Sequence, residues 1–87
     1  MPYIKQEFRP AIEEKAKALI ESINCAGDMN FAFTVIAREF AKKKKISYAT
    51  FNEIVGAFEC CKLELYRRAI APYEDKKIEE NGDVFDN

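Results

Sequence analysis

The sequence predicts an all-α fold, a three-helix antiparallel bundle with a long, Pro-kinked third helix, completed by oligomerisation. Apolar residues recur at helical spacing over residues 10–24, 28–43 and 48–80, and no stretch alternates as a strand does. The connections between these stretches are short, which favours antiparallel neighbours. A length of 87 residues allows one domain, with an N-terminal arm at 1–9 and an acidic tail at 83–87.

The first helix is predicted to begin at Pro10, because a proline in the first turn removes no helical hydrogen bond. Glu13 and Glu14 follow, where negative charge suits the positive end of the helix dipole. Its repeating apolar residues are Ile12, Ala16, Leu19, Ile20 and Ile23. Residues 24–27 should end it.

Asp28 is predicted to cap the start of the second helix, since aspartate is a favoured N-cap residue. Residues 42–45, a run of four lysines, should end this helix, where cations suit the negative end of the dipole. The apolar positions between are Phe31, Ala32, Val35, Ile36 and Phe40.

The third helix has two plausible starts, Ser47 as an N-cap or a capping box of Thr50 with Glu53. Pro72 clashes with the carbonyl group four residues earlier, so we expect a kink or a break at Ala71–Pro72. Asn81 and Gly82 should stop the helix. On a helical wheel a continuous stripe is formed by Phe51, Val55, Phe58, Lys62, Tyr66, Ala69 and Tyr73.

Further apolar residues on both flanks leave about a third of this wheel polar, so the helix must be packed from two sides. A straight helix over residues 48–80 would be about 50 Å long, whereas a compact monomer of this length should be about 30 Å across. We therefore expect a homo-oligomer with Phe51, Val55, Gly56 and Phe58 at its interface. Gly56 in mid-helix indicates either close approach of another backbone or simple sequence drift.

The residues that are missing exclude several kinds of chemistry. The chain has no histidine, which rules out histidine-based triads, bases and metal ligands. Cys25, Cys60 and Cys61 do not follow the spacing of a zinc site or a disulfide framework. We expect no catalytic residue, no metal and no cofactor. No apolar run is long enough to span a membrane and no signal peptide is evident, so a cytoplasmic protein is expected.

The lysine run Lys42–Lys45 has two interpretations. It could contact the phosphates of a nucleic acid, or it could be a solvated helix end. The net charge of −1 and the adjacent Glu39 favour the second interpretation, so nucleic acid is not the expected partner.

A second candidate site lies in the third helix. Two arginines and two tyrosines could hold an anion by forked hydrogen bonds and stacking, and a nearby lysine interrupts the apolar stripe. Plain alternatives are ion pairs of Glu64 with Arg67 and Arg68, and a lysine that reaches Glu59. The candidate ligand-binding residues are Lys62, Tyr66, Arg67, Arg68 and Tyr73.

The chain shows a family resemblance in three segments: MPYIKQE at residues 1–7, GDMN at 27–30, and the stretch from Ser47 and Tyr48 through Gly56 to YRRAIAPYEDKKIEENGD at 66–83. It resembles a short family of uncharacterised proteins associated with bacteria and their phages. The resemblance covers nearly the whole chain and implies a free-standing accessory protein. It transfers no activity and no functional residue.

We expect the chain not to be an enzyme, and two function classes come before the alternative of nucleic-acid binding through Lys42–Lys45. The first is an oligomeric phage accessory or counter-defence protein that binds an anionic, nucleotide-like ligand, by analogy with small helical phage proteins that sequester nucleotide signals. The alternative is a protein–protein interaction or regulatory module, in which the same aromatic residues form an interface.

Overall fold

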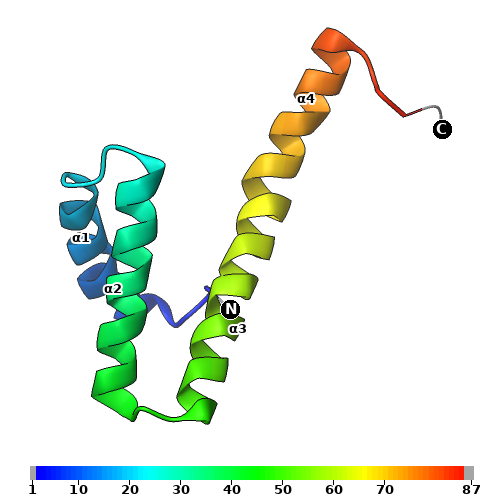
Figure 1. Ribbon diagram of the computed structural model, residues 1–87. Coiled ribbons are helices and arrows are strands. Elements are labelled where there is room, and N and C mark those ends of the chain that lie inside the picture. The colour runs from blue at the N-terminus through cyan, green and yellow to red at the C-terminus, as the bar shows by residue number, and fades with distance from the viewer. Residues whose placement is uncertain (1, 86–87) are drawn as a thin grey trace. The chain divides into compact units, whose positions relative to one another are not determined.

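The computed structural model describes residues 2–85, and these residues form helices joined by short connections (Figure 1). The α-helices are α1 (Arg9–Ile20), α2 (Ala26–Lys44), α3 (Tyr48–Leu65) and α4 (Ala71–Asn81). A 3₁₀ turn η1 (Gln6–Phe8) precedes α1, and a π turn η2 (Tyr66–Ile70) joins α3 to α4. No strand occurs among the described residues. The predicted all-α class and the long third helix are confirmed.

The chain divides into two compact units. The N-terminal unit, Tyr3–Gly56, contains α1, α2 and the first half of α3. The C-terminal unit contains, besides Pro2, the chain from Ala57 onward, with the rest of α3, then η2, α4 and the tail. Within the N-terminal unit α1 and α2 form an antiparallel hairpin (Figure 1).

The first helix begins one residue earlier than predicted and ends at Ile20 rather than at residue 24. Pro10 lies in the first turn of α1. A proline is favoured there because the N–H group that it lacks would have no hydrogen-bond partner within the helix. Arg9 Nε donates a hydrogen bond of 2.9 Å to the carbonyl of Ile4. This bond ties the N-terminal arm to the start of α1.

The prediction that Asp28 is the N-cap of the second helix is wrong. The N-cap is Cys25, whose Sγ accepts a hydrogen bond from the backbone N–H of Asp28 at 3.4 Å. Asp28 lies in the first turn, and its carboxylate accepts a bond of 3.0 Å from the N–H of Asn24. These two bonds form a reciprocal arrangement similar to a capping box. Because Cys25 is the N-cap, α2 begins at Ala26, two residues before the predicted start.

Of the two predicted starts of the third helix, the structure selects Ser47. Its hydroxyl accepts a bond of 3.2 Å from the N–H of Thr50 and also contacts the Thr50 hydroxyl at 3.1 Å. The helix begins at Tyr48, directly after this cap.

Small side chains fill the buried positions. Among the described residues the buried ones are Ala32, Ala41 and Thr50, all in the N-terminal unit. Large apolar side chains of α2 remain exposed: 69% of Phe31 and 52% of Ile36 are accessible to solvent. The N-terminal unit therefore buries little of its aromatic and branched aliphatic surface.

Pro72 does not break the helix, because the irregularity lies one turn earlier. The backbone stays helical from α3 through η2 into α4, and Pro72 lies in the first turn of α4. In the π turn the N–H of Ala71 bonds to the carbonyl of Tyr66, five residues back. This wider turn relieves the clash that Pro72 would make in a regular α-helix.

The helix stops where the sequence predicts. The N–H of Gly82 bonds to the carbonyl of Ile78 at 2.8 Å, and Gly82 has a φ of 90°, a conformation that other residues rarely adopt. In the tail, the N–H of Phe85 bonds to the Asp83 carboxylate at 2.9 Å. Residues 86–87 of the predicted acidic tail lie outside the described residues.

Candidate functional site

The C-terminal unit carries a row of apolar side chains along one helix, here called the C-terminal apolar face. It consists of Phe58, Cys61, Leu65, Ile70 and Tyr73. The first three follow the spacing of three and four residues that keeps side chains on one side of an α-helix. Ile70 follows Leu65 by five residues, and the π turn between them, with its hydrogen bond from residue i+5 to residue i, brings Ile70 back to the side of Leu65. The π turn therefore continues the face past Pro72.

Most of this face is open to solvent. Leu65 is 57% exposed and Tyr73 is 60% exposed, while Phe58 and Ile70 are about two-fifths exposed. The described residues from Ala57 onward form one helical column and a short tail, and a single helix cannot cover its own apolar face.

Two of the predicted ligand-binding cations are paired within the helix. Lys62 Nζ lies 3.0 Å from the Glu59 carboxylate, three residues earlier. Arg67 forms an equivalent ion pair with Glu64. Both pairs match the plainer of the two interpretations of these residues, a solvated ion pair on a helix surface. Arg68 forms no ion pair with any residue of the described chain.

The five predicted ligand-binding residues point to different sides of one helix. Successive residues of an α-helix diverge by about 100°, so Tyr66, Arg67 and Arg68 point in three directions. Tyr73 lies on the apolar face, and Lys62 lies at its edge. A single copy therefore does not gather the five side chains round one ligand.

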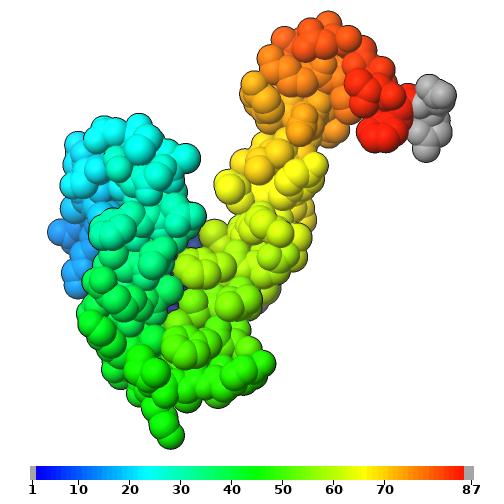
Figure 2. Space-filling view, viewed as in Figure 1, coloured from blue at the N-terminus to red at the C-terminus, as the bar shows by residue number. Residues whose placement is uncertain are grey.

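A shallow groove of about 420 Å³ does include one of them, Tyr66. It lies between the end of α4 and the tail, which Figure 2 shows in orange and red. Its lining residues are Tyr66, Glu74, Lys77, Ile78, Asn81, Gly82, Asp83, Val84 and Phe85. We call it the tail groove.

Lys77 is the residue of the tail groove that sequence reasoning missed. Its ammonium group lies 5.4 Å from the centre of the Tyr73 ring and 3.7 Å from the Glu80 carboxylate. The spacing of four residues between Tyr73 and Lys77 was the available signal. With Glu74 and Asp83 also lining the groove, carboxylates outnumber the single cation there, which does not favour an anionic ligand.

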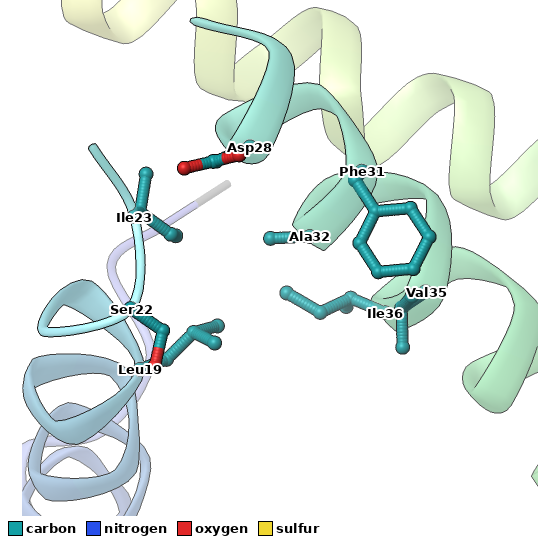
Figure 3. A pocket seen from close by; sticks show the side chains of 8 residues that line it. All are labelled: Leu19, Ser22, Ile23, Asp28, Phe31, Ala32, Val35 and Ile36. Atoms are coloured by element: carbon teal, nitrogen blue, oxygen red, sulfur yellow. The ribbon is translucent and has the colours of Figure 1, made fainter. Parts of the chain in front are cut away.

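A second groove, of about 370 Å³, lies within the α1–α2 hairpin of the N-terminal unit (Figure 3). Leu19 from α1 and Ala32 and Ile36 from α2 point into it. Asp28 lies at its edge, but its carboxylate already accepts the N–H of Asn24. The groove offers apolar contacts and no free charged group.

The lysine run is partly neutralised by Glu39. This carboxylate lies 2.8 Å from Arg38 Nε and 3.3 Å from Lys42 Nζ. Hydrogen bonds from Arg38 first, and then from Lys42, lower the pKa of Glu39 below its usual range. Lys44 lies 5.9 Å from the centre of the Phe40 ring. These contacts fit a solvated helix end rather than a row of cations held ready for phosphates.

No group of three acidic or cysteine residues close enough to share a metal ion occurs within residues 2–85. The three cysteines are exposed and form no disulfide. In the part of the chain that the structure describes, no helix has the length and apolar character to cross a bilayer.

The chain belongs to the family described as a domain of unknown function (DUF6899), whose model matches residues 1–84. This agrees with the uncharacterised family that the sequence motifs resemble. No curated protein and no solved structure matches the chain.

Proposed function

We propose that this protein is a non-enzymatic, homo-oligomeric interaction module whose C-terminal apolar face binds a second copy. The observation that supports the proposal most strongly is that this face lies on one helical column with more than half of Leu65 and Tyr73 exposed. Contiguous exposed apolar surface of this kind marks interaction sites in soluble proteins.

The side chains of this face offer a favourable contribution to assembly. Full burial of one large apolar side chain contributes about 1.5–3 kcal/mol. Four large side chains per copy, each about half exposed, supply several kcal/mol when two copies meet. Tyrosine and phenylalanine are also enriched in the centres of interfaces, where flat rings bury much area at little entropic cost.

The helix-surface ion pairs support the same interpretation. Lys62 and Glu59 are exposed and paired with each other, and Arg67 is paired with the partly buried Glu64. Lys62, at the edge of the C-terminal apolar face, suits the polar rim of an interface better than the wall of a pocket.

An anionic, nucleotide-like ligand is the second candidate function. Arg68, which forms no ion pair among the described residues, favours it. A shared site would need Arg68 from one copy and aromatic residues from another. Calorimetry with mononucleotides and cyclic nucleotides, comparing the parent with Arg68→Ala, tests this candidate. We also propose that the protein has an accessory role in phages or bacteria and that it is located in the cytoplasm.

Sedimentation equilibrium at micromolar concentration tests the main proposal. The expected result is a species of at least twice the 10.0 kDa chain mass, with helical circular dichroism unchanged on dilution until the assembly dissociates. A folded 10.0 kDa monomer at every concentration would contradict it.

A further inference from the structure

We propose that the connection between α2 and α3 binds the surface of a lipid bilayer that contains anionic lipids. The binding segment is residues 42–48, here called the basic tip. The proposal goes beyond the homo-oligomer, because the basic tip belongs to the N-terminal unit and the C-terminal apolar face takes no part in it.

The basic tip lies at one end of the N-terminal unit, where the chain turns from α2 into α3 (Figure 1). Helix α2 has 19 residues and its antiparallel neighbour α1 has 12, and the last turns of α2 extend beyond the start of α1 (Figure 1). Buried residues hold the tip on both sides, since Ala41 is 2% exposed and Thr50 is 7% exposed. The tip can therefore present its side chains to a flat surface.

Four exposed lysines, Lys42–Lys45, give the tip its charge. Lys43 and Lys45 form no ion pair with any described residue. Residues 38–53 hold five cations and two anions, a net charge of +3, whereas the rest of the chain carries −4. The neighbouring start of α1 does not cancel this charge, because residues 5–17 hold four cations and three anions. Positive charge is thus concentrated at this end of the N-terminal unit.

Two apolar side chains of the tip lie beside the lysines and remain largely exposed. Solvent reaches 63% of Ile46 and 82% of Tyr48. Ser47 between them is half-buried, and its hydroxyl accepts the N–H of Thr50. The tip therefore combines cations with one aliphatic and one aromatic side chain.

This combination fits a bilayer surface. Anionic lipids attract lysines through the negative potential of the membrane surface, and the boundary between headgroups and acyl chains accepts aliphatic side chains and tyrosine rings. Single-stranded nucleic acid is bound by phosphate contacts and by stacking on aromatic rings, which leaves Ile46 without a role. The aliphatic side chain thus favours the bilayer.

The ion pairs of Glu39 with Arg38 and Lys42 do not oppose this proposal. Attraction to a charged membrane surface is diffuse, so it acts on solvated lysines and does not need cations held against single phosphates. A solvated helix end is the form in which such lysines are presented.

Co-sedimentation of the full-length protein with lipid vesicles tests the proposal. Vesicles of phosphatidylcholine mixed with phosphatidylglycerol should bind the protein in low salt, and binding should weaken as salt is added because ions screen the surface charge. Vesicles of phosphatidylcholine alone should bind it at least about tenfold more weakly.

A pair of lysine variants tests the charge. Lys43→Gln with Lys45→Gln should weaken binding to the mixed vesicles by about twentyfold, since each lysine near an anionic surface contributes about fivefold. Lys76→Gln with Lys77→Gln makes the same change of charge in α4. This matched control should change binding by less than about threefold.

A pair of isoleucine variants tests the apolar contact. Ile46→Thr should weaken binding to the mixed vesicles by about tenfold, because the side chain no longer enters the apolar boundary. Ile12→Thr is the matched control, since Ile12 is 61% exposed but lies in α1, outside the tip. It should leave binding unchanged. Circular dichroism checks that each variant is as helical as the parent.

Four outcomes would overturn the proposal. They are no binding to the mixed vesicles in low salt, equal binding to phosphatidylcholine alone, equal losses in the two lysine variants, and equal losses in the two isoleucine variants. Binding of single-stranded RNA that weakens with Lys43→Gln and Lys45→Gln, together with vesicle binding that Ile46→Thr leaves unchanged, would assign the tip to nucleic acid instead. None of these outcomes depends on whether the chain self-associates.

Discussion

The backbone N–H of Ala71 donates its hydrogen bond to the carbonyl of Tyr66, five residues earlier in the chain. This bond defines the π turn that precedes Pro72. It lets a helix with a proline in its interior continue for eleven residues of α4, and it brings Ile70 onto the same side as Leu65. One irregular turn thus accommodates the proline and aligns two halves of an apolar face.

Replacing the proline should separate these two effects. In Pro72→Ala the clash disappears, and a regular α-helix becomes accessible through residues 66–72. Such a helix would rotate Tyr73 by about 100° relative to Leu65. We expect the helical circular dichroism signal to be kept or increased while self-association weakens, as measured by sedimentation.

Pro10→Ala is the matched control, because Pro10 also lies in a first helical turn but follows no π turn. It should leave self-association unchanged. Equal assembly by the parent chain and Pro72→Ala would show that the π turn does not align the interface.

A pair of leucines tests the C-terminal apolar face directly. Leu63 and Leu65 are of the same type and equally exposed, 57% each, but they lie about 200° apart round the helix. A Leu→Ala change at a site buried by assembly costs about 2–5 kcal/mol. Leu65→Ala should therefore weaken self-association by at least about tenfold, while Leu63→Ala should change it little. Similar losses in both variants, measured by sedimentation, would place the interface elsewhere.

The regular features of this fold could be predicted because they depend on local chemistry. Apolar spacing marks the three helical stretches, Ser47 offers a side-chain cap, and Gly82 offers the φ of 90° that ends the last helix. The prediction at Asp28 is wrong because cysteine is an uncommon N-cap residue, whereas aspartate is favoured both as an N-cap and in the first turn of a helix.

The candidate site was harder to predict, for a geometrical reason. A wheel with a constant 100° step places Tyr73 beside Tyr66, whereas the π turn rotates it toward Leu65. The sequence shows that Pro72 disturbs the helix but not how the backbone absorbs the disturbance. The ion pairs of Lys62 and Arg67, by contrast, follow from spacing alone and were among the stated alternatives.

Glu39, which lies beside the lysine run, provides a prediction of pH dependence. The pKa of Glu39 is lowered, first by its hydrogen bond with Arg38 and then by Lys42. A carboxyl whose pKa is lowered by folding contributes stability above its unfolded pKa and loses it as the pH falls through the folded pKa. We expect Arg38→Gln to raise the pKa of Glu39 toward its ordinary value, and Lys42→Gln to raise it less.

Carboxyl NMR titration measures this shift residue by residue, and Lys43→Gln is the control because Lys43 forms no ion pair in the described chain. A Glu39 titration that is the same in all three variants would show that the two contacts do not persist in solution.

Gly56 gives the sharpest test of the two readings that the sequence left open, because they predict opposite signs. A Cβ built at this position meets no atom within 4 Å, so the chain itself leaves room for alanine. Alanine is about 1 kcal/mol more favourable than glycine inside a helix.

If no second copy packs there, Gly56→Ala should raise the free energy of unfolding by about that amount, which corresponds to a rise of about 4–8 °C in melting temperature. Ala57→Gly, the neighbouring reverse change, should lower it by a similar amount. We expect this gain, because Gly56 lies on the opposite side of the helix from Phe58 and the C-terminal apolar face. This expectation departs from the sequence-based prediction that Gly56 lies at the interface together with Phe58. Thermal unfolding at one fixed protein concentration provides the measurement. A loss of stability together with weaker self-association would instead place the backbone of a second copy against Gly56.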